Sequence, residues 1–306
     1  MLTKESRNKP YSALFISIVS VSFAAIFIVS CKAPPLSIAL YRLLFTTLLV
    51  FPLILISRKT RNELLSLPRS TLLIMVVIGV ILAAHFALWI TSLTKTSVAS
   101  SVILVTAHPI IVGPISHFFL KEKLSFINAM GICISVMGVI ILVLGNYGFN
   151  MFSLDSLEGN ILAMLGGVAA GVYILGGRKI RKTVSVASYA FVVYSVSTIT
   201  LFFICLFFGS PVYGLSSIDL GIILLMAFVA GILGHTLYNW SLEHIRASVA
   251  SVALLGEPLG STLLAFVIPW ISQVPSYYTI IGGGVILLGI YLTTRNTTEK
   301  ALLDEI

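Results

Sequence analysis

The chain is a series of ten apolar segments, each close to the roughly 20 residues that an α-helix needs to cross a bilayer core. Inside the hydrocarbon region a segment must satisfy its own backbone polar groups, so apolar segments of this length are expected to be helices. The connections are short and leave no room for a soluble domain. We therefore predict an all-α membrane protein. Its ten transmembrane helices are predicted at about residues 11–30, 36–57, 70–92, 98–119, 126–145, 157–177, 187–208, 218–239, 247–270 and 278–294.

The composition supports this class and excludes others. Apolar residues make up 58% of the chain and charged residues 10%, whereas soluble domains contain about 25% charged residues. The net charge of +8 comes from short basic clusters between apolar segments, so it carries topology information and does not indicate nucleic-acid binding. The three cysteines are scattered, which predicts neither a disulfide framework nor a metal site.

The basic residues predict the orientation in the membrane. If the N-terminus is inside, 16 of the 19 Lys and Arg residues lie in cytoplasmic segments, Lys32 and Lys95 lie outside, and Arg42 lies within the second span. This bias predicts N-in and C-in termini in a multi-pass protein of the cytoplasmic membrane. The sequence 28–31 resembles a lipoprotein processing site, but the first apolar segment is longer than the apolar region of a signal peptide.

Two regions of the chain have matching patterns, 89–114 and 238–263. Each contains a Ser-Leu pair, and each places a proline 16 residues after that leucine, Pro109 in one and Pro258 in the other. Five helices per half is an odd number, so the second half must enter the membrane from the opposite side. We predict two inverted five-helix repeats, residues 1–150 and 151–306, related by a pseudo-twofold axis in the membrane plane.

Small residues on three spans predict close helix contacts, because glycine lets helix backbones approach each other in lipid. We expect them to serve packing. The fifth and tenth helices are expected to form a dimer-like or peripheral seam. The residues are Gly131 and Gly138, Gly166, Gly167 and Gly171, and Gly282, Gly283, Gly284 and Gly289.

Pro109 and Pro258 are predicted to break their helices and act as hinges. A proline removes a backbone donor and leaves a carbonyl without its usual partner. An ionisable residue precedes each one: His108 in the first copy and Glu257 in the second. A carboxylate at this depth is expected to be neutral or paired with a cation. Both residues are therefore candidates for substrate binding or proton coupling, and the alternative is that they are structural hydrogen-bonding groups beside the breaks.

Further side chains complete the candidate binding site. Arg42 suits a carboxylate or phosphate, although it could also extend to the outer interface. The histidines at 85 and 235 are each followed, four residues later, by a side chain on the same helix face. The aromatic candidates could line a pocket or belong to an interfacial belt. The predicted substrate-binding or coupling residues, besides His108 and Glu257, are Arg42, His85, Trp89, Tyr173, His235, Tyr238 and Asn239.

Four motifs give the chain a family resemblance. They are Ala33-Pro34-Pro35-Leu36-Ser37 with Tyr41-Arg42, Leu93-Thr94-Lys95-Thr96-Ser97-Val98-Ala99 before Pro109, Leu120-Lys121-Glu122-Lys123-Leu124-Ser125, and Leu242-Glu243-His244 before Gly256-Glu257-Pro258. With them the whole chain resembles the EamA-type transporters of the drug/metabolite transporter superfamily. The resemblance implies ten helices in two repeats and a carrier of small metabolites, often an exporter. Two departures are His108, where many members have Glu, and the absence of a Glu turn at 270–273.

The sequence therefore predicts a secondary transporter, not an enzyme, that works by alternating access. The expected cargo is an amino acid or related compound, moved out of the cytoplasm, with protons as a candidate coupling ion and no cofactor. The partners would be the small molecule and the lipid bilayer, for a monomer or a homodimer. One alternative is a flippase for a lipid-linked carrier. The other is an intramembrane metal hydrolase using His85, His108 and His235, although the chain has no hydrolase motif and no P-loop.

Overall fold

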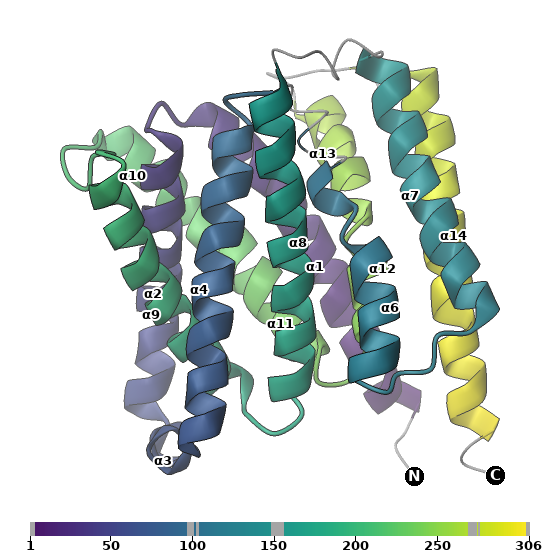
Figure 1. Ribbon diagram of the computed structural model, residues 1–306, viewed down its shortest axis with the longest axis horizontal. Coiled ribbons are helices and arrows are strands. Elements are labelled where there is room, and N and C mark those ends of the chain that lie inside the picture. The colour runs from purple at the N-terminus through teal and green to yellow at the C-terminus, as the bar shows by residue number, and fades with distance from the viewer. Residues whose placement is uncertain are drawn as a thin grey trace.

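The computed structural model describes residues 4–96, 101, 104–147, 156–268, 274 and 276–303. These residues form helices that stand side by side (Figure 1). The helices are α1 Lys4–Ser30, α2 Pro35–Ile56, α3 Arg58–Ser66, α4 Arg69–Ser92, α6 Pro109–Phe119, α7 Phe126–Tyr147, α8 Leu157–Ile180, α9 Val186–Phe207, α10 Ser217–Met226, the π-helix η3 Ala227–Thr236, α11 Leu237–Ser241, α12 Ala247–Ala253, α13 Gly256–Val267 and α14 Tyr277–Leu303.

The predicted all-α membrane class is confirmed. Among the described residues, eight helical stretches are long and apolar enough to cross a bilayer, and two shorter apolar helices lie at 104–119 and 126–142. The shorter ones coincide with the fourth and fifth predicted spans, so the count of ten crossings stays a prediction. The helix α1 begins and α14 ends at one end of the bundle, where α3 also lies (Figure 1). That end is called the α3 end below, and its cytoplasmic location stays a prediction.

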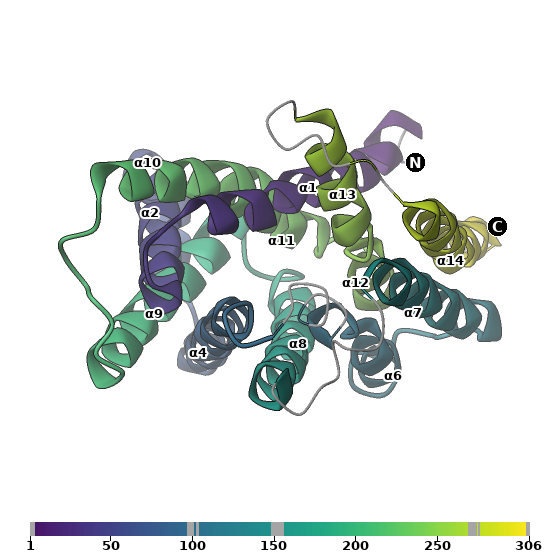
Figure 2. The same cartoon turned by 90° about the horizontal axis from the view of Figure 1, so that it is seen from above.

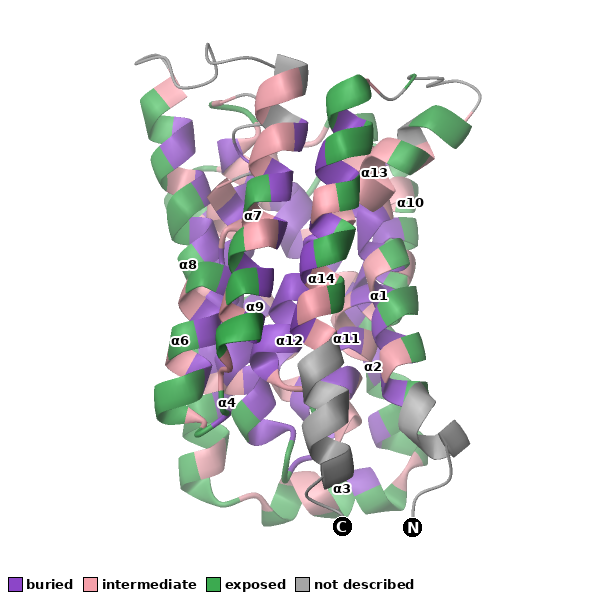
Figure 3. Cartoon of the chain, turned by 90° about the vertical axis from the view of Figure 1, so that its right-hand side faces the viewer, coloured by how far each residue is buried: buried purple, intermediate pink, exposed green. Residues whose placement is uncertain are grey.

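The outer faces of the helices are apolar and exposed. Large side chains such as Phe51, Leu73 and Phe203 are exposed to different degrees on different helices, and buried residues line the inner sides (Figure 3). In water such a surface would be unfavourable, but lipid tails are as apolar as these side chains. The exposed apolar surface is what a bilayer-embedded bundle requires.

The first five predicted helices contact the second five in matching pairs. The helix α2 packs on α9, and α7 packs on α14. The contact of α4 with α8 has its counterpart in the contact of α1 with η3. Seen from above, the pair α2 and α9 and the pair α7 and α14 occupy opposite edges of the molecule (Figure 2). The remaining helices lie between these edges.

The seam between α7 and α14 depends on glycine, as predicted for the fifth and tenth helices. A Cβ built on Gly138 would lie 2.6 Å from the backbone nitrogen of Ile286 and 2.8 Å from the carbonyl oxygen of Gly282. Real Cβ atoms do not approach backbone this closely, so the two helices could not keep this spacing with alanine at position 138.

We expect Gly138→Ala to lower the free energy of unfolding by about 1–3 kcal/mol, the usual cost of overpacking a tight contact. Gly284 on α14 is the matched control, because a Cβ there meets nothing within 4 Å. Gly284→Ala should change stability little. The measurement is thermal unfolding of the detergent-solubilised variants. Equal melting temperatures for Gly138→Ala and Gly284→Ala would show that α7 and α14 can move apart without loss of stability.

Both proline-containing spans are interrupted. The chain turns at 107–108 and α6 starts at Pro109, while in the ninth span α12 ends before a turn at 254–255 and α13 contains Pro258. The first break rests on α8: a Cβ on Gly167 would lie 2.9 Å from the carbonyl oxygens of both Leu104 and Val105. Glycine therefore allows α8 to cover the backbone that Pro109 leaves without a donor.

The eighth span is not a uniform α-helix. Its middle, η3, is a ten-residue π-helix, in which the Thr236 hydroxyl donates to the Gly231 carbonyl five residues earlier (3.0 Å). Extended π-helix is rare and is frequent at functional sites. His235 and Thr236 lie at its C-terminal end.

Candidate functional site

Arg42 is at the centre of the candidate site. It lies on α2 and is 1% exposed, and its guanidinium carbon stands 4.6 Å from the centre of the Phe86 ring on α4. Stacking on an aromatic face offsets part of the cost of burying the cation. Its Nη1 has no hydrogen-bond partner among the residues that the structure describes. This position excludes the alternative in which Arg42 extends to the membrane interface.

The histidines extend this cluster along α4 and η3. The His85 ring nitrogen Nδ1 hydrogen bonds with the Gly166 carbonyl of α8 (2.9 Å), and the ring stacks on Trp89 at 5.9 Å. The His235 ring meets the edge of Phe86 at 5.4 Å. The predicted shared face of His85 and Trp89 is therefore present, and the two halves meet at Phe86.

The aromatic candidates are inside the bundle. Trp89 is 8% exposed and Tyr238 is 2% exposed, so neither belongs to a lipid-facing belt. The Trp89 Nε1 and the Tyr238 hydroxyl are both buried without a hydrogen-bond partner. The nearby Trp240 is half-buried and contacts the His244 ring.

Asn239 joins α8, α9 and α11. Its amide nitrogen donates to the Tyr173 hydroxyl (2.5 Å) and the Tyr194 hydroxyl (3.2 Å), and Tyr194 also contacts the Thr236 hydroxyl (3.2 Å). Both amide hydrogens are thus used, and the Oδ1 of Asn239 is left buried without a donor. Tyr194 was not among the sequence-predicted residues.

Glu257 lies in the first turn of α13, beside the second break. It is partly exposed, and its carboxyl forms no hydrogen bond with any residue that the structure describes. It interacts electrostatically with Arg42 but does not form an ion pair with it within the 4.0 Å limit. The opposite charges are thus neighbours that are not in contact.

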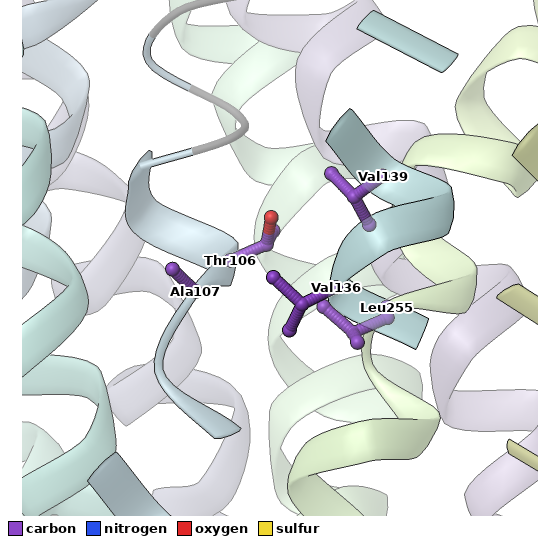
Figure 4. A pocket seen from close by; sticks show the side chains of 5 residues that line it. All are labelled: Thr106, Ala107, Val136, Val139 and Leu255. Atoms are coloured by element: carbon purple, nitrogen blue, oxygen red, sulfur yellow. The ribbon is translucent and has the colours of Figure 1, made fainter. Parts of the chain in front are cut away.

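His108 lies at the first break and is 5% exposed, with Nδ1 unpartnered. It interacts electrostatically with His85, which in turn interacts with Arg42. His108 and Glu257 are therefore connected to one cluster from opposite halves. The two breaks also line one small pocket, in which Thr106 and Ala107 of the first break lie near Leu255 of the second, with Val136 and Val139 of α7 (Figure 4).

The described residues contain an unusual set of buried polar atoms without partners. Each such atom costs about 1–3 kcal/mol if nothing binds it. Most of them belong to sequence-predicted site residues, whereas Ser17 and Tyr189 were missed because a single Ser or Tyr in an apolar span gives no signal. The atoms are Ser17 Oγ, Arg42 Nη1, Trp89 Nε1, His108 Nδ1, Tyr189 Oη, Tyr238 Oη and Asn239 Oδ1.

The histidines do not form a metal centre in the part of the chain that is described. No group of three or more His, Cys, Asp or Glu side chains there is placed to hold a metal ion. His85 and His235 instead contact aromatic rings. Nothing in this geometry favours the metal-hydrolase alternative.

Comparison with known proteins identifies relatives over the whole length. The EamA-like transporter family matches twice, over residues 10–144 and 157–295. The uncharacterized transporter YyaM of Bacillus subtilis (strain 168) is 25% identical over 222 residues, which cover 70% of each chain. Two uncharacterized transporters of Archaeoglobus fulgidus are 28% identical over 207 residues (66% and 68% of the two chains) and 23% identical over 287 residues (93% and 96%).

A solved crystal structure has the same fold. It superimposes with a TM-score of 0.79 at 19% identity and covers 96% of this chain and 99% of its own. At this identity the likeness concerns the fold alone.

Proposed function

The chain belongs to the EamA-like transporter family, and we propose that it carries an amino acid or a related zwitterionic metabolite across the cytoplasmic membrane by alternating access. Multi-pass membrane transport is the property of the family. The substrate class, the direction and the mechanism are the proposal. Net export is included because the family that the sequence resembles often exports.

The observation that carries the substrate class is the pair Arg42 and Glu257. Both are ionisable groups in the interior, and neither forms an ion pair with a residue that the structure describes. A zwitterion offers a carboxylate to the guanidinium and an ammonium to the carboxylate. Arginine suits this role because its planar fork binds carboxylates with two parallel hydrogen bonds.

The surrounding side chains fit the rest of such a molecule. Phe86, Trp89 and Tyr238 supply aromatic surface, while the free Trp89 Nε1 and Asn239 Oδ1 supply one donor and one acceptor. Ligand sites are typically apolar with a few placed polar groups. An amino acid with an apolar or aromatic side chain would contact the apolar surface and also bind the polar groups.

Alternating access is supported by equivalent contacts in the two halves. Gly171 of α8 lies beside His108, where a Cβ would be 3.7 Å from that of His108. Ser22 of α1 lies 149 positions before Gly171, and its hydroxyl donates to the Glu257 carbonyl (3.3 Å). His108 and Glu257 are also 149 residues apart. In the proposal the halves form an inverted repeat and rock about these contacts, with Pro109 and Pro258 as hinges.

Protons are the coupling ion in this proposal. Glu257 would release a proton when it binds the ammonium of the substrate and take one up when the substrate leaves. When water leaves the site, Glu257 would take up a proton and His108, at the equivalent position, would lose one, because water loss disfavours the charged form of each group.

A thermal-shift comparison of three related compounds tests the substrate class. The probes are L-phenylalanine, phenethylamine without the carboxylate, and 3-phenylpropionate without the amine. A ligand at 100 times its Kd stabilises the native state by about 2.7 kcal/mol. We expect the melting temperature to rise with the amino acid, or with another apolar amino acid, and not with the two single-charge analogues. An equal rise with the amine or the acid alone would contradict a zwitterion site.

A further inference from the structure

The α3 end of the bundle contains a network of charged side chains outside the candidate site, three of them buried and the fourth, Glu243, exposed. Its four members are Glu122, Arg178, Arg181 and Glu243, and we call it the latch cluster. Arg178 Nε donates to Glu122 Oε1 at 2.7 Å, and both side chains are at most 10% exposed. Breaking a buried ion pair by removing one partner is strongly unfavourable, because the remaining charge has no compensation.

Glu122 is the member from the first half. It follows α6 in a turn in which Lys121 has a φ of 56°, a left-handed conformation that usually requires glycine. The Glu122 N–H donates to the Ser116 carbonyl (3.2 Å), six residues back, so this turn folds back onto the last turn of α6. This turn is what directs the Glu122 side chain toward α8 and α12.

Both carboxylate oxygens of Glu122 bind the second half. One accepts from Arg178 on α8, and the other accepts from the backbone N–H of Ala247 at the start of α12 (2.9 Å). Arg178 Nη1 donates to the carbonyls of Leu242 and Glu243 (2.7 and 2.8 Å). A single carboxylate thus connects the end of the fourth span to the sixth, eighth and ninth.

Arg181 and Glu243 complete the cluster. Arg181 Nη2 donates to the Glu243 carboxylate, and its Nε donates to the Asn239 carbonyl (3.1 Å). Burial lowers the pKa of the Arg181 guanidinium, and the Glu243 carboxylate opposes this shift. Because Asn239 also binds Tyr173 and Tyr194, the latch cluster is connected through one residue to the candidate substrate site.

The opposite end has a weaker connection between the halves. There Lys95 pairs with Glu158 at 2.9 Å, but their side chains are 41% and 67% exposed. Exposed pairs contribute little to stability. The residue 149 positions after Glu122 is Ile271, which cannot form an equivalent ion pair and lies outside the described residues. Among the described residues, the buried ion pair between the halves lies at the α3 end, while at the opposite end the buried Asp219 carboxylate accepts from the Lys32 backbone N–H (2.9 Å).

We propose that Glu122 is a positioning residue that locks the α3 end closed, so that the substrate site opens to that side only after Glu122 releases Arg178 and the start of α12. This inference rests on the alternating access of the proposed function. It assigns the closed end to specific contacts, in which Glu122 is the first-half carboxylate that binds both α8 and the start of α12. Glu63 of α3 also bonds the second half at this end, through Ser185 and Ser188.

Distances between spin labels test the latch without any substrate. Labels are placed at Lys123→Cys and Lys182→Cys, which are exposed at the α3 end on opposite halves, after replacement of Cys31, Cys133 and Cys205. The parent protein should give one dominant short distance. Glu122→Gln should add a longer distance and increase the open population by more than about tenfold. Glu158→Gln, at the opposite end, is the matched control and should leave the distribution unchanged.

A second variant covers the possibility that Glu122→Gln does not fold. Ala247→Pro removes the N–H that Glu122 binds and leaves Glu122 itself unchanged, and proline is accepted at the first position of a helix. The preceding Arg246 has φ −59° and ψ 146°, which a following proline favours. It should also add the longer distance. An unchanged distribution in the folded variant or variants would overturn the latch, whereas failure of the ligand tests alone would leave this result standing.

Discussion

Replacing Arg42 with methionine is expected to abolish ligand binding and to leave the unliganded protein at least as stable as the parent. The guanidinium is buried, and its Nη1 has no partner among the described residues, so an apolar side chain of similar length removes the cost of burying an unpartnered donor. Truncating one partner of a buried charge pair typically costs about 2–5 kcal/mol, so the loss of affinity should exceed about 30-fold.

Thermal unfolding with and without the stabilising amino acid measures both effects in one experiment. Arg42→Met should melt no lower than the parent and should lose the ligand-induced shift. Arg42→Lys is the control for charge alone: it keeps the cation but not the planar fork, and we expect weakened binding. A ligand shift of parental size in Arg42→Met would exclude Arg42 from the site.

Glu257→Gln is expected to fold normally and to transport at least about tenfold less, since glutamine keeps the shape and loses the charge that would hold the substrate ammonium. The carboxyl has no hydrogen-bond partner among the described residues, so the packing beside α13 should change little. The remaining transport should also lose its response to pH, because the group proposed to exchange the proton is gone.

Transport by Glu257→Gln is compared with Glu158→Gln, which removes an exposed carboxylate at the opposite end of the bundle. The control should transport like the parent protein. The range to examine is roughly pH 5.5 to 8, which spans the shifted values that buried carboxyl groups reach. Normal transport by Glu257→Gln throughout this range would make Glu257 a structural residue of the second break.

The sequence predicted the parts of the fold that depend on local pattern. Apolar length predicted the helices, and the matched positions of Pro109 and Pro258 predicted the two interruptions, although Pro52 lies inside the continuous helix α2. The stacking of His85 on Trp89 follows from a spacing of four residues on one helix. Glycines on the fifth and tenth spans indicated the seam that α7 and α14 form.

Other features depend on contacts between distant segments and could not be predicted. The cation of Arg42 is held on Phe86, 44 positions later in the chain, and no local pattern connects them. The π-helix before Leu237 has no sequence signature that we could identify. Glu122 was seen only as part of a family-like motif, although the left-handed turn at Lys121 and the pairing with Arg178 give it a specific role in the packing.

The central claim is that this protein carries zwitterionic amino acids through the site around Arg42 and Glu257. Counterflow in liposomes tests it most directly: purified protein is reconstituted into vesicles loaded with an unlabelled amino acid, and entry of the radiolabelled compound is followed. We expect saturable entry of the radiolabelled amino acid. Excess unlabelled amino acid should abolish this entry, and Arg42→Met should eliminate it. Entry no faster than in protein-free vesicles, for every member of a broad panel of amino acids, would contradict it.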